Sequence, residues 1–394
     1  MRDFDFVHRP RIVFGCGASA RVGELALAEN ATRVLLVSDN GVLAAGHTDA
    51  VAAALRDHRM SVAVFTDVHE NPTHHDVSAC VELARRQVPD LIIGLGGGSA
   101  LDVAKACNMV CAEGSEITRH PGTTRATKPH RPMIAIPTTA GTGSECQAHA
   151  VISDAETGAK TAFATSESLP KTVILDPVLT LTQPRRVTVH SGLDAIVHAV
   201  EVTVTTSRNP LSTLFAAEAF GLLNQNLPIV LASPDDLDAR GAMQLGAALA
   251  GLAIAHSMLG AAHAAGNPLT ARYHITHGES VASMLPAVIR FNAQDDGARA
   301  CYADLAARAG LAADAADPHE RVQALLTRLA QLWSLTGNPP DLAGYGVRAD
   351  DVDDLAVAAA QQWTGTFNPR PVDADAFRGL YLDALAADAG TVLV

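Results

Sequence analysis

The sequence has 394 residues, 48% of them hydrophobic, which is long enough for two packed domains. Its formal net charge of −13 disfavours nucleic acid as a partner, because an acidic surface repels phosphate backbones. The segment MRDFDFVHRP is charged where a signal peptide needs an apolar stretch, and glycines interrupt the apolar residues 245–255, so we expect neither a secretion signal nor a membrane span. Six cysteines without a CxxC pair favour reduced thiols and a cytoplasmic location.

The first half alternates short β-branched runs with amphipathic stretches. Helical patterns lie between several of these runs, for example at residues 48–56 and 77–86. Such alternation predicts a doubly wound, mostly parallel sheet flanked by helices. The strands are predicted at residues 11–14, 33–37, 61–65, 91–94, 133–136 and 173–175.

After Gln183 and Pro184 the pattern changes. Helical periodicity rich in alanine and leucine continues nearly to the C-terminus, interrupted by prolines. The sequence therefore predicts an α/β domain over residues 1–184, followed by an all-helical domain over residues 185–394.

Two glycine clusters compete for a dinucleotide phosphate in the first half. GGGSALDVAK, residues 96–105, follows a buried-strand pattern and opens a helix, where backbone N–H groups can approach a phosphate. Asp102 lies in its first turn, where it suits the helix dipole or could reach a ribose hydroxyl. GCGASA, residues 15–20, resembles the ordinary G-x-G-x-x-A fingerprint. Asp39 has the right separation for a ribose 2′-hydroxyl in either case, and would favour NAD over NADP.

A third segment, IPTTAGTGSE at residues 136–145, follows another strand and is dense in hydroxyl groups and glycine. Such a loop can donate to a pyrophosphate or to the nicotinamide carboxamide. Two loops of this kind after neighbouring strands predict one shared site at the carboxyl ends of those strands.

The helical half contains a candidate metal site. Asp194 and His198 are spaced i, i+4 and lie on one helical face among aliphatic residues, where a carboxylate needs a charged partner. His263 lies at the end of one helical pattern and His277 at the start of the next. One aspartate with up to three histidines suits zinc, ferrous iron or manganese, and the ligand types do not choose among them.

These motifs resemble the iron-containing, or group III, alcohol dehydrogenases over nearly the full length. The residues that carry the resemblance are GGGSALDVAKA (96–106), PTTAGTGSE (137–145), SGLDAIVHAVE (191–201) and the H-x13-HG segment (263–278). The resemblance implies a dehydroquinate synthase-like architecture with a dinucleotide-binding α/β domain and an all-helical metal-binding domain. It implies NAD and one divalent metal, Fe2+ or Zn2+, as cofactors, and a homodimer.

The resemblance also assigns residues to these sites. It places phosphates on residues 96–99 and leaves residues 15–20 as an early turn. The implied metal ligands, also catalytic through the metal, are Asp194, His198, His263 and His277. The implied cofactor contacts are Asp39, Asn71, Gly97, Gly98, Ser99, Asp102, Thr138, Thr139, Thr142 and Lys160.

The sequence departs from the family pattern at two positions. Many members have a histidine four residues after the third ligand, where this chain has Asn267, which can bind a substrate but cannot relay a proton near neutral pH. His149 lies where the family usually has a less polar residue close to the substrate, and could favour a polar or anionic substrate. Both are candidate substrate contacts.

The expected reaction is hydride transfer between a small alcohol and nicotinamide, with the metal acting as a Lewis acid on the alcohol oxygen. A maleylacetate reductase-like enzyme acting on an anionic oxo acid is the alternative within the superfamily. Activities like those of dehydroquinate synthase or glycerol-1-phosphate dehydrogenase fit PTTAGTGSE and HAVE less well. From another class, a non-catalytic nucleotide sensor would retain the fold, but a complete ligand set argues against it.

Overall fold

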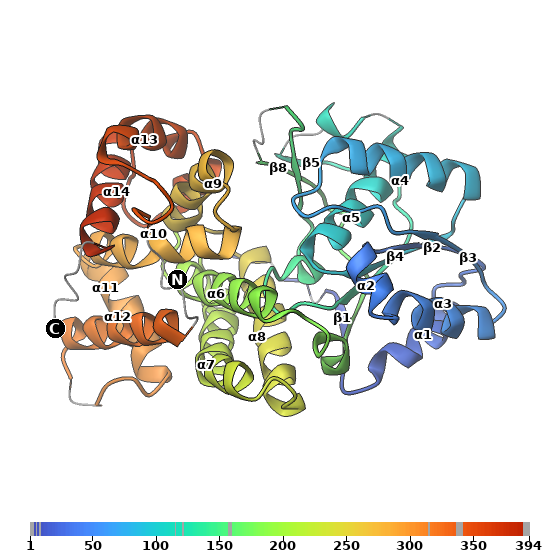
Figure 1. Ribbon diagram of the computed structural model, residues 1–394, viewed down its shortest axis with the longest axis horizontal. Coiled ribbons are helices and arrows are strands. Elements are labelled where there is room, and N and C mark those ends of the chain that lie inside the picture. The colour runs from blue at the N-terminus through green and yellow to red at the C-terminus, as the bar shows by residue number, and fades with distance from the viewer. Residues whose placement is uncertain are drawn as a thin grey trace. The chain divides into compact units, whose positions relative to one another are not determined.

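The computed structural model describes residues 4, 6–7, 9–114, 116–119, 122–156, 160–313, 316–335 and 342–388. The chain divides into two compact units, one of Phe6–Pro184 and one whose main part begins at Arg185. The first unit is an α/β structure and the second is helical among its described residues, as the ribbon shows (Figure 1).

A six-stranded parallel sheet forms the centre of the first unit. Its order is β1-β9-β6-β4-β2-β3. From β2 the chain adds β3 on one side and then β4 on the other, so the strand order reverses between β2 and β4. The predicted doubly wound sheet is confirmed, and each of the six predicted strands is present to within two residues at either end. The strands are β1 (Arg11–Phe14), β2 (Arg33–Val37), β3 (Ser61–Phe65), β4 (Leu91–Gly96), β6 (Met133–Pro137) and β9 (Thr172–Leu175).

Helices cover both faces of this sheet (Figure 1). Alternate residues of each strand point to opposite faces, so Leu36 and Ile93 pack on the same side as α1 and α3, whereas Leu35 and Ile92 pack towards α4 and α5. The helices are α1 (Val22–Ala28), α2 (Asn40–Ala44), α3 (His47–Asp57), α4 (His74–Gln87) and α5 (Gly98–Glu113).

A second, three-stranded sheet lies beside α5. It consists of β5 (Gly122–Thr124), β7 (Ala150–Ser153) and β8 (Lys160–Thr165), in the order β5-β8-β7. The sequence pattern did not predict these strands, because they are short and their polar and apolar residues do not form a long alternation. Their pairing with one another and the burial of Ile152 and Phe163 against α4 and α5 stabilise them instead.

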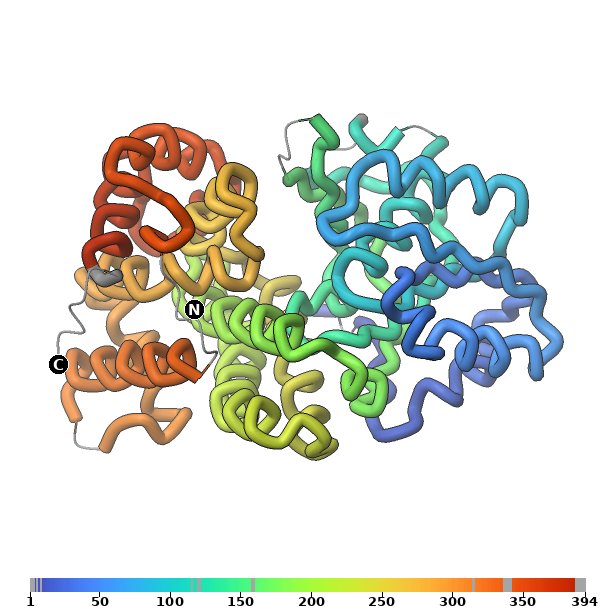
Figure 2. Tube along the Cα trace, viewed as in Figure 1, coloured from blue at the N-terminus to red at the C-terminus, as the bar shows by residue number. Residues whose placement is uncertain are grey.

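The second unit is a bundle of helices around α6. From Thr188 onwards nearly every residue of α6 is buried, because α7, α8 and α10 all pack against it. The chain path of α7 followed by α8 can be traced in Figure 2. The described helices are α6 (Arg185–Val202), α7 (Pro210–Ala232), α8 (Leu237–Ala255), α9 (Ala261–Tyr273), α10 (His277–Asn292), α11 (Asp296–Arg308), α12 (Pro318–Leu335), α13 (Val352–Ala360) and α14 (Ala374–Asp388).

Among the described residues, one helix is long and apolar enough to cross a membrane by length and composition. This helix is α7, with a mean hydropathy of 1.3 over its most apolar window. The sequence pattern pointed instead to residues 245–255 as the most apolar segment. Phe220, Leu223 and Leu227 of α7 are fully buried, and α7 packs against α6 and α8. One face of α7 therefore belongs to the core, and 39% of its most apolar window is buried.

Candidate metal and dinucleotide sites

Three histidines from three helices converge on one carboxylate oxygen, that of Asp194, in the helical unit. Asp194 and His198 lie one turn apart on α6, and His277 is the first residue of α10. His263 lies in the first turn of α9, so the prediction that it ends a helix was wrong. From the Oδ1 atom of Asp194, the Nε2 atom of His198 is 3.3 Å away, and those of His263 and His277 are each 3.7 Å away. The Asp194–His198 pair on α6 thus meets two histidines from distant parts of the chain at a single point.

The donor set fits a divalent metal ion. The Oδ1 atom of Asp194 and the Nε2 atom of His263 are buried and have no hydrogen-bond partner among the described residues. The ligand atoms of Asp194, His263 and His277 lie within 4.8 Å of one another, and His198 joins them through its contact with Asp194. Metal bonds of about 2.1 Å at tetrahedral angles separate neighbouring ligand atoms by about 3.4 Å, close to the spacings observed here.

The charged side chains of this cluster shift one another's pKa values. Burial by itself would raise the pKa of Asp194, but His198, His277 and His263 outweigh it and hold the pKa of that carboxyl well below its usual range. Burial likewise would lower the pKa of His263, but Glu201 and Asp194 raise it to about 9. Binding of a metal ion at neutral pH must therefore displace a proton from His263.

Glu201 is a site residue to which the sequence pattern assigned no role. Its carboxylate is buried, and its Oε2 atom lies 2.5 Å from the Nδ1 atom of His263. The signal was available, because Asp194, His198 and Glu201 are spaced i, i+4, i+7 and so lie on one face of α6.

Close packing positions the N-terminus of α10. A Cβ atom on Gly278 would lie 2.0 Å from the backbone oxygen of His190 on α6, so only glycine permits this crossing. The His190 imidazole also pairs with Glu279 of α10, at 3.2 Å. These contacts determine the place of His277, which directly precedes Gly278.

In the α/β unit, the two predicted nucleotide loops pack against each other. The strands β4 and β6 that precede them are neighbours, and Thr138 donates its backbone N–H to the Gly96 carbonyl at 3.0 Å. A Cβ atom on Gly98 would lie 2.8 Å from the Thr142 side chain, and one on Gly97 would lie 3.3 Å from Thr139. Ser99 follows in the first turn of α5. The structure therefore brings these glycine and threonine residues together.

Asp39 lies beside the same loop. It caps α2 by accepting the Val42 N–H at 2.9 Å, and its Oδ2 atom lies 3.0 Å from the position of a Cβ atom on Gly96. Asp39 follows β2 and Gly96 ends β4, so the two flank the point where the strand order reverses, which is the usual ligand position in such sheets.

Asn71 and Lys160 lie outside the glycine loop, Asn71 before α4 and Lys160 at the start of β8. Asn71 has left-handed backbone angles just before α4, and the next residue, Pro72, accepts the Ser153 N–H at 2.8 Å. Ser153 of β7 pairs in register with Lys160 of β8. The small sheet thus links these two predicted contacts.

Asp102 is engaged inside the protein. Its carboxylate accepts from the Ser144 hydroxyl at 2.5 Å and from the Val151 N–H at 2.9 Å, and it pairs with Lys105 at 3.0 Å. Lys105 is buried and also donates to the Ser144 carbonyl and to that of His149. Asp102 thus pairs with Lys105 and anchors the second loop to α5.

The competing glycine cluster at residues 15–20 is a turn at the edge of the sheet. Asp176 accepts the backbone N–H groups of Gly17 and Ser19 and also the Ser19 hydroxyl. A carboxylate of the chain itself thus occupies the donors that a phosphate would need, which agrees with the assignment of this segment as an early turn.

Glu145 in the second loop is a fully buried carboxyl, and burial raises its pKa to about 7. Between the unfolded value near 4.5 and pH 7 the folded state holds the extra proton, so the stability of the folded protein should fall as the pH rises through this window. We expect Glu145→Gln to abolish this loss and to be more stable than wild type above pH 7, by up to about 3 kcal/mol. Unfolding midpoints of both proteins, measured without metal from pH 4.5 to pH 8, would test this expectation. The same dependence of the midpoint on pH in both proteins would contradict it.

The two candidate substrate contacts have defined surroundings. Asn267 on α9 lies one turn beyond His263 and donates to the Gln362 side chain at 3.0 Å. Burial, followed by the charge of Lys105, lowers the pKa of His149 to about 4, and its Nε2 atom lies 3.4 Å from the Thr123 hydroxyl. A neutral imidazole offers no charge to an anionic substrate.

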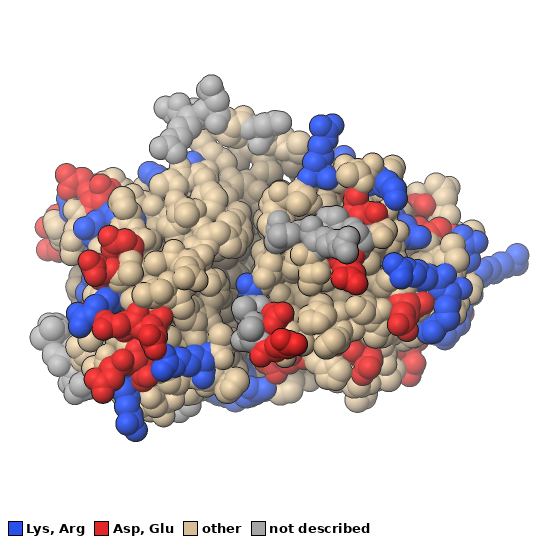
Figure 3. Space-filling model, turned by 90° about the horizontal axis from the view of Figure 1, so that it is seen from above, with Lys and Arg blue, Asp and Glu red and all other residues tan. Residues whose placement is uncertain are grey.

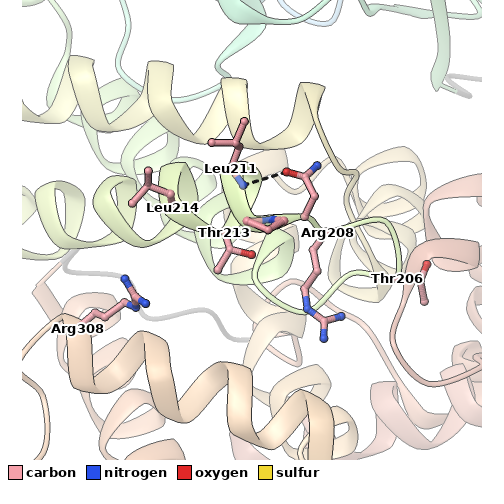
Figure 4. Close-up of a pocket in the computed structure, with 8 residues that line it drawn as sticks. Thr206, Arg208, Leu211, Thr213, Leu214 and Arg308 are labelled. Carbon is pink, nitrogen blue, oxygen red and sulfur yellow. Dashed lines mark hydrogen bonds between the residues drawn. The ribbon is translucent and has the colours of Figure 1, made fainter. Parts of the chain in front are cut away.

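A cavity of about 700 Å³ lies at the N-terminus of α7, and none of the predicted site residues lines it (Figure 4). Asn209 accepts the Leu211 and Ser212 N–H groups, so this helix end is already capped. Arg208 donates to backbone carbonyls and Arg308 pairs with Asp304. On the face shown in Figure 3, acidic and basic side chains are interspersed, without an extended basic patch.

Comparison with known proteins matches both halves of the chain. Residues 9–177 match the iron-containing alcohol dehydrogenase family, and residues 188–385 match the C-terminal region of the same family. The NAD-dependent methanol dehydrogenase of Bacillus methanolicus is 31% identical over 366 residues, covering 93% of this chain and 96% of that protein. A crystal structure of 1,3-propanediol oxidoreductase aligns with a TM-score of 0.92 and 30% identity, covering 97% of this chain and 100% of the other.

The alternative within the superfamily is more distant. Maleylacetate reductase from Agrobacterium tumefaciens aligns with a TM-score of 0.79 and 29% identity, covering 98% of this chain and 99% of the other. The family binds NAD and a metal, which agrees with the predicted cofactors. The resemblance found in the sequence is confirmed: the chain belongs to the iron-containing alcohol dehydrogenases and is an oxidoreductase that acts on CH–OH groups.

Proposed function

We propose that Asp194, His198, His263 and His277 hold one divalent metal ion, Fe2+ with Zn2+ as the alternative. The convergence of the three histidines on the Asp194 Oδ1 atom carries this proposal. When bound, the metal supplies Lewis-acid chemistry to the oxygen of an alcohol or carbonyl. The protein contributes a buried, negatively charged cluster in which the ligand atoms are already gathered.

The dinucleotide is proposed to bind at the paired loops that follow β4 and β6. The backbone N–H groups at the start of α5 would receive the phosphates, because a helix N-terminus carries partial positive charge. The threonine hydroxyls of the second loop lie next to these glycines and can donate to the same ligand. The residues in this proposal are Asp39, Asn71, Gly97, Gly98, Ser99, Thr138, Thr139, Thr142 and Lys160, with Asp102 acting from beneath the loop.

The substrate is proposed to be a small neutral alcohol or its aldehyde or ketone. His149 is neutral at physiological pH and Asn267 with Gln362 forms an uncharged hydrogen-bonding pair, so neither favours an oxo acid. The methanol and propanediol enzymes among the relatives act on such alcohols by name. A cytoplasmic homodimer is proposed as the working form, as is usual for members of this family.

Metal removal tests the proposed function. Purified protein would be treated with a chelator, reloaded with Fe2+ or Zn2+, and assayed by NADH absorbance against aldehydes, ketones and one oxo acid. We expect the chelated protein to lose turnover and one metal ion per chain to restore it. The rate of turnover with aldehydes or ketones should exceed the rate with the oxo acid. Full turnover without metal would refute the role given to the four ligands, and a preference for the oxo acid would refute the substrate class.

Asp39 should determine the preference for NAD over NADP. Its carboxylate lies beside Gly96, where it would repel a 2′-phosphate. In Asp39→Gly we expect the ratio of kcat/KM for NAD to that for NADP to fall about tenfold or more, equivalent to ~1.4 kcal/mol. Glycine is tolerated at a helix N-cap, so α2 should persist. Asp49→Asn, on the exposed side of α3, serves as the charge-matched control. An unchanged ratio would remove Asp39 from the ribose site.

A further inference from the structure

We propose that Glu201 is a positioning residue of the metal centre: it orients His263, determines which ring nitrogen carries the proton, and supplies the second negative charge that balances a divalent cation. This inference rests on the proposed metal site. Glu201 lies on α6, two turns beyond Asp194.

The first step is the contact with the His263 ring. The Oε2 atom of Glu201 lies 2.5 Å from the His263 Nδ1 atom, and both side chains are almost fully buried. A carboxylate can only accept, so Nδ1 must carry the proton and donate it to Glu201. Once a metal ion displaces the second proton of the ring, the lone pair of the Nε2 atom, 3.7 Å from the Asp194 Oδ1 atom, is available to that ion.

The second step is the position of α9 itself. The N-cap residue of α9 is Gly260, which has no side chain to satisfy the first backbone N–H groups of the helix. The Oε1 atom of Glu201 accepts these instead, from Ala262 at 2.6 Å and from His263 at 3.3 Å. A carboxylate at a helix N-terminus is also favoured by the helix dipole. Glu201 therefore holds both the backbone and the ring of the same ligand.

The third step is charge. Among the described residues, no lysine or arginine pairs with Glu201, although a buried carboxylate is costly without a cation. With three neutral imidazoles, Asp194 and Glu201 give the centre a net charge of about −2, which one divalent ion neutralises. The nearby polar groups, Asn368 and Tyr302, are uncharged.

Replacing Glu201 by glutamine, its amide isostere, tests these roles while the shape of the side chain stays the same. Glutamine has the length of glutamate but only one acceptor oxygen, and Glu201 uses both of its oxygens. In Glu201→Gln, either the α9 N–H groups or the His263 Nδ1–H group must face an NH2 donor. The variant therefore loses the charge and one side of the double contact while preserving volume.

The experiment measures Zn2+ and Co2+ affinity by competition with a chelator. We expect Glu201→Gln to bind both ions about 10- to 100-fold more weakly than wild type. Glu201→Asp keeps the charge and both acceptors on a shorter side chain, so it should bind more tightly than Glu201→Gln. Glu218→Gln, on the exposed side of α7, is the matched control and should bind like wild type. Equal affinity in Glu201→Gln and wild type, or no gain in Glu201→Asp, would overturn the proposal.

Wild-type protein provides a test that does not depend on a variant folding. In Zn2+-loaded protein labelled with 15N-histidine, a metal-bound histidine should show an Nδ1–H proton that exchanges slowly with solvent, together with a metal-shifted Nε2. Absence of such a histidine would overturn the inference. Failure of wild type to bind either ion would instead refute the proposed metal site, so the two failures are distinguishable.

Discussion

In the Asp194→Asn variant we expect turnover to fall by about a thousandfold or more, with loss of the bound metal. Asp194 is the point at which three histidines meet, and the asparagine side chain has nearly the same shape without the charge. The loss of a Lewis acid removes several kcal/mol of stabilisation from a developing alkoxide, and each 1.4 kcal/mol is about tenfold in rate. Metal content by elemental analysis and steady-state rates with NADH would be measured on the same preparations.

Two controls make this result specific. Asp238→Asn, at an exposed position near the start of α8, removes the same charge from the same unit and should retain metal and activity. Binding of NADH to Asp194→Asn should match wild type, because the proposed dinucleotide loops belong to the other unit. Substantial turnover by metal-free Asp194→Asn would rule out the assigned role, and weakened NADH binding would indicate a general folding defect instead.

For Lys105→Met we expect a loss of about 3–5 kcal/mol in the free energy of unfolding, together with weaker dinucleotide binding. Removing the buried ammonium leaves the Asp102 carboxylate without its cation, a change that typically costs this much. It also removes the donor that ties the Ser144 and His149 carbonyls to α5. The measurements are guanidinium unfolding and titration with NADH.

The matched control for this substitution is Lys171→Met. Lys171 is exposed and pairs with Glu29 at 3.3 Å, and such surface pairs contribute at most about 1 kcal/mol. The double variant Lys105→Met/Asp102→Asn should recover much of the lost stability, because no unpaired charge then remains in the interior. If Lys105→Met lowered the free energy of unfolding no more than Lys171→Met does, the buried pair would not be the anchor of the loop.

The fold could be predicted from sequence where local patterns repeat. The central strands are continuous apolar runs because helices cover both of their faces, and the helical pattern after residue 184 needs no knowledge of distant contacts. The small sheet of β5, β7 and β8 was not predicted, because three short strands acquire their order only from one another.

The same distinction applies to the candidate sites. Helical spacing by itself determined that Asp194 and His198 share a face of α6, since 3.6 residues per turn is a local property of the chain. Only the tertiary structure decided that His263 and His277 meet them, that Asp102 pairs with Lys105 inside the protein, and that Glu201 holds α9. These contacts join residues far apart in the chain, and their partners depend on how whole helices pack, which no short stretch of sequence encodes.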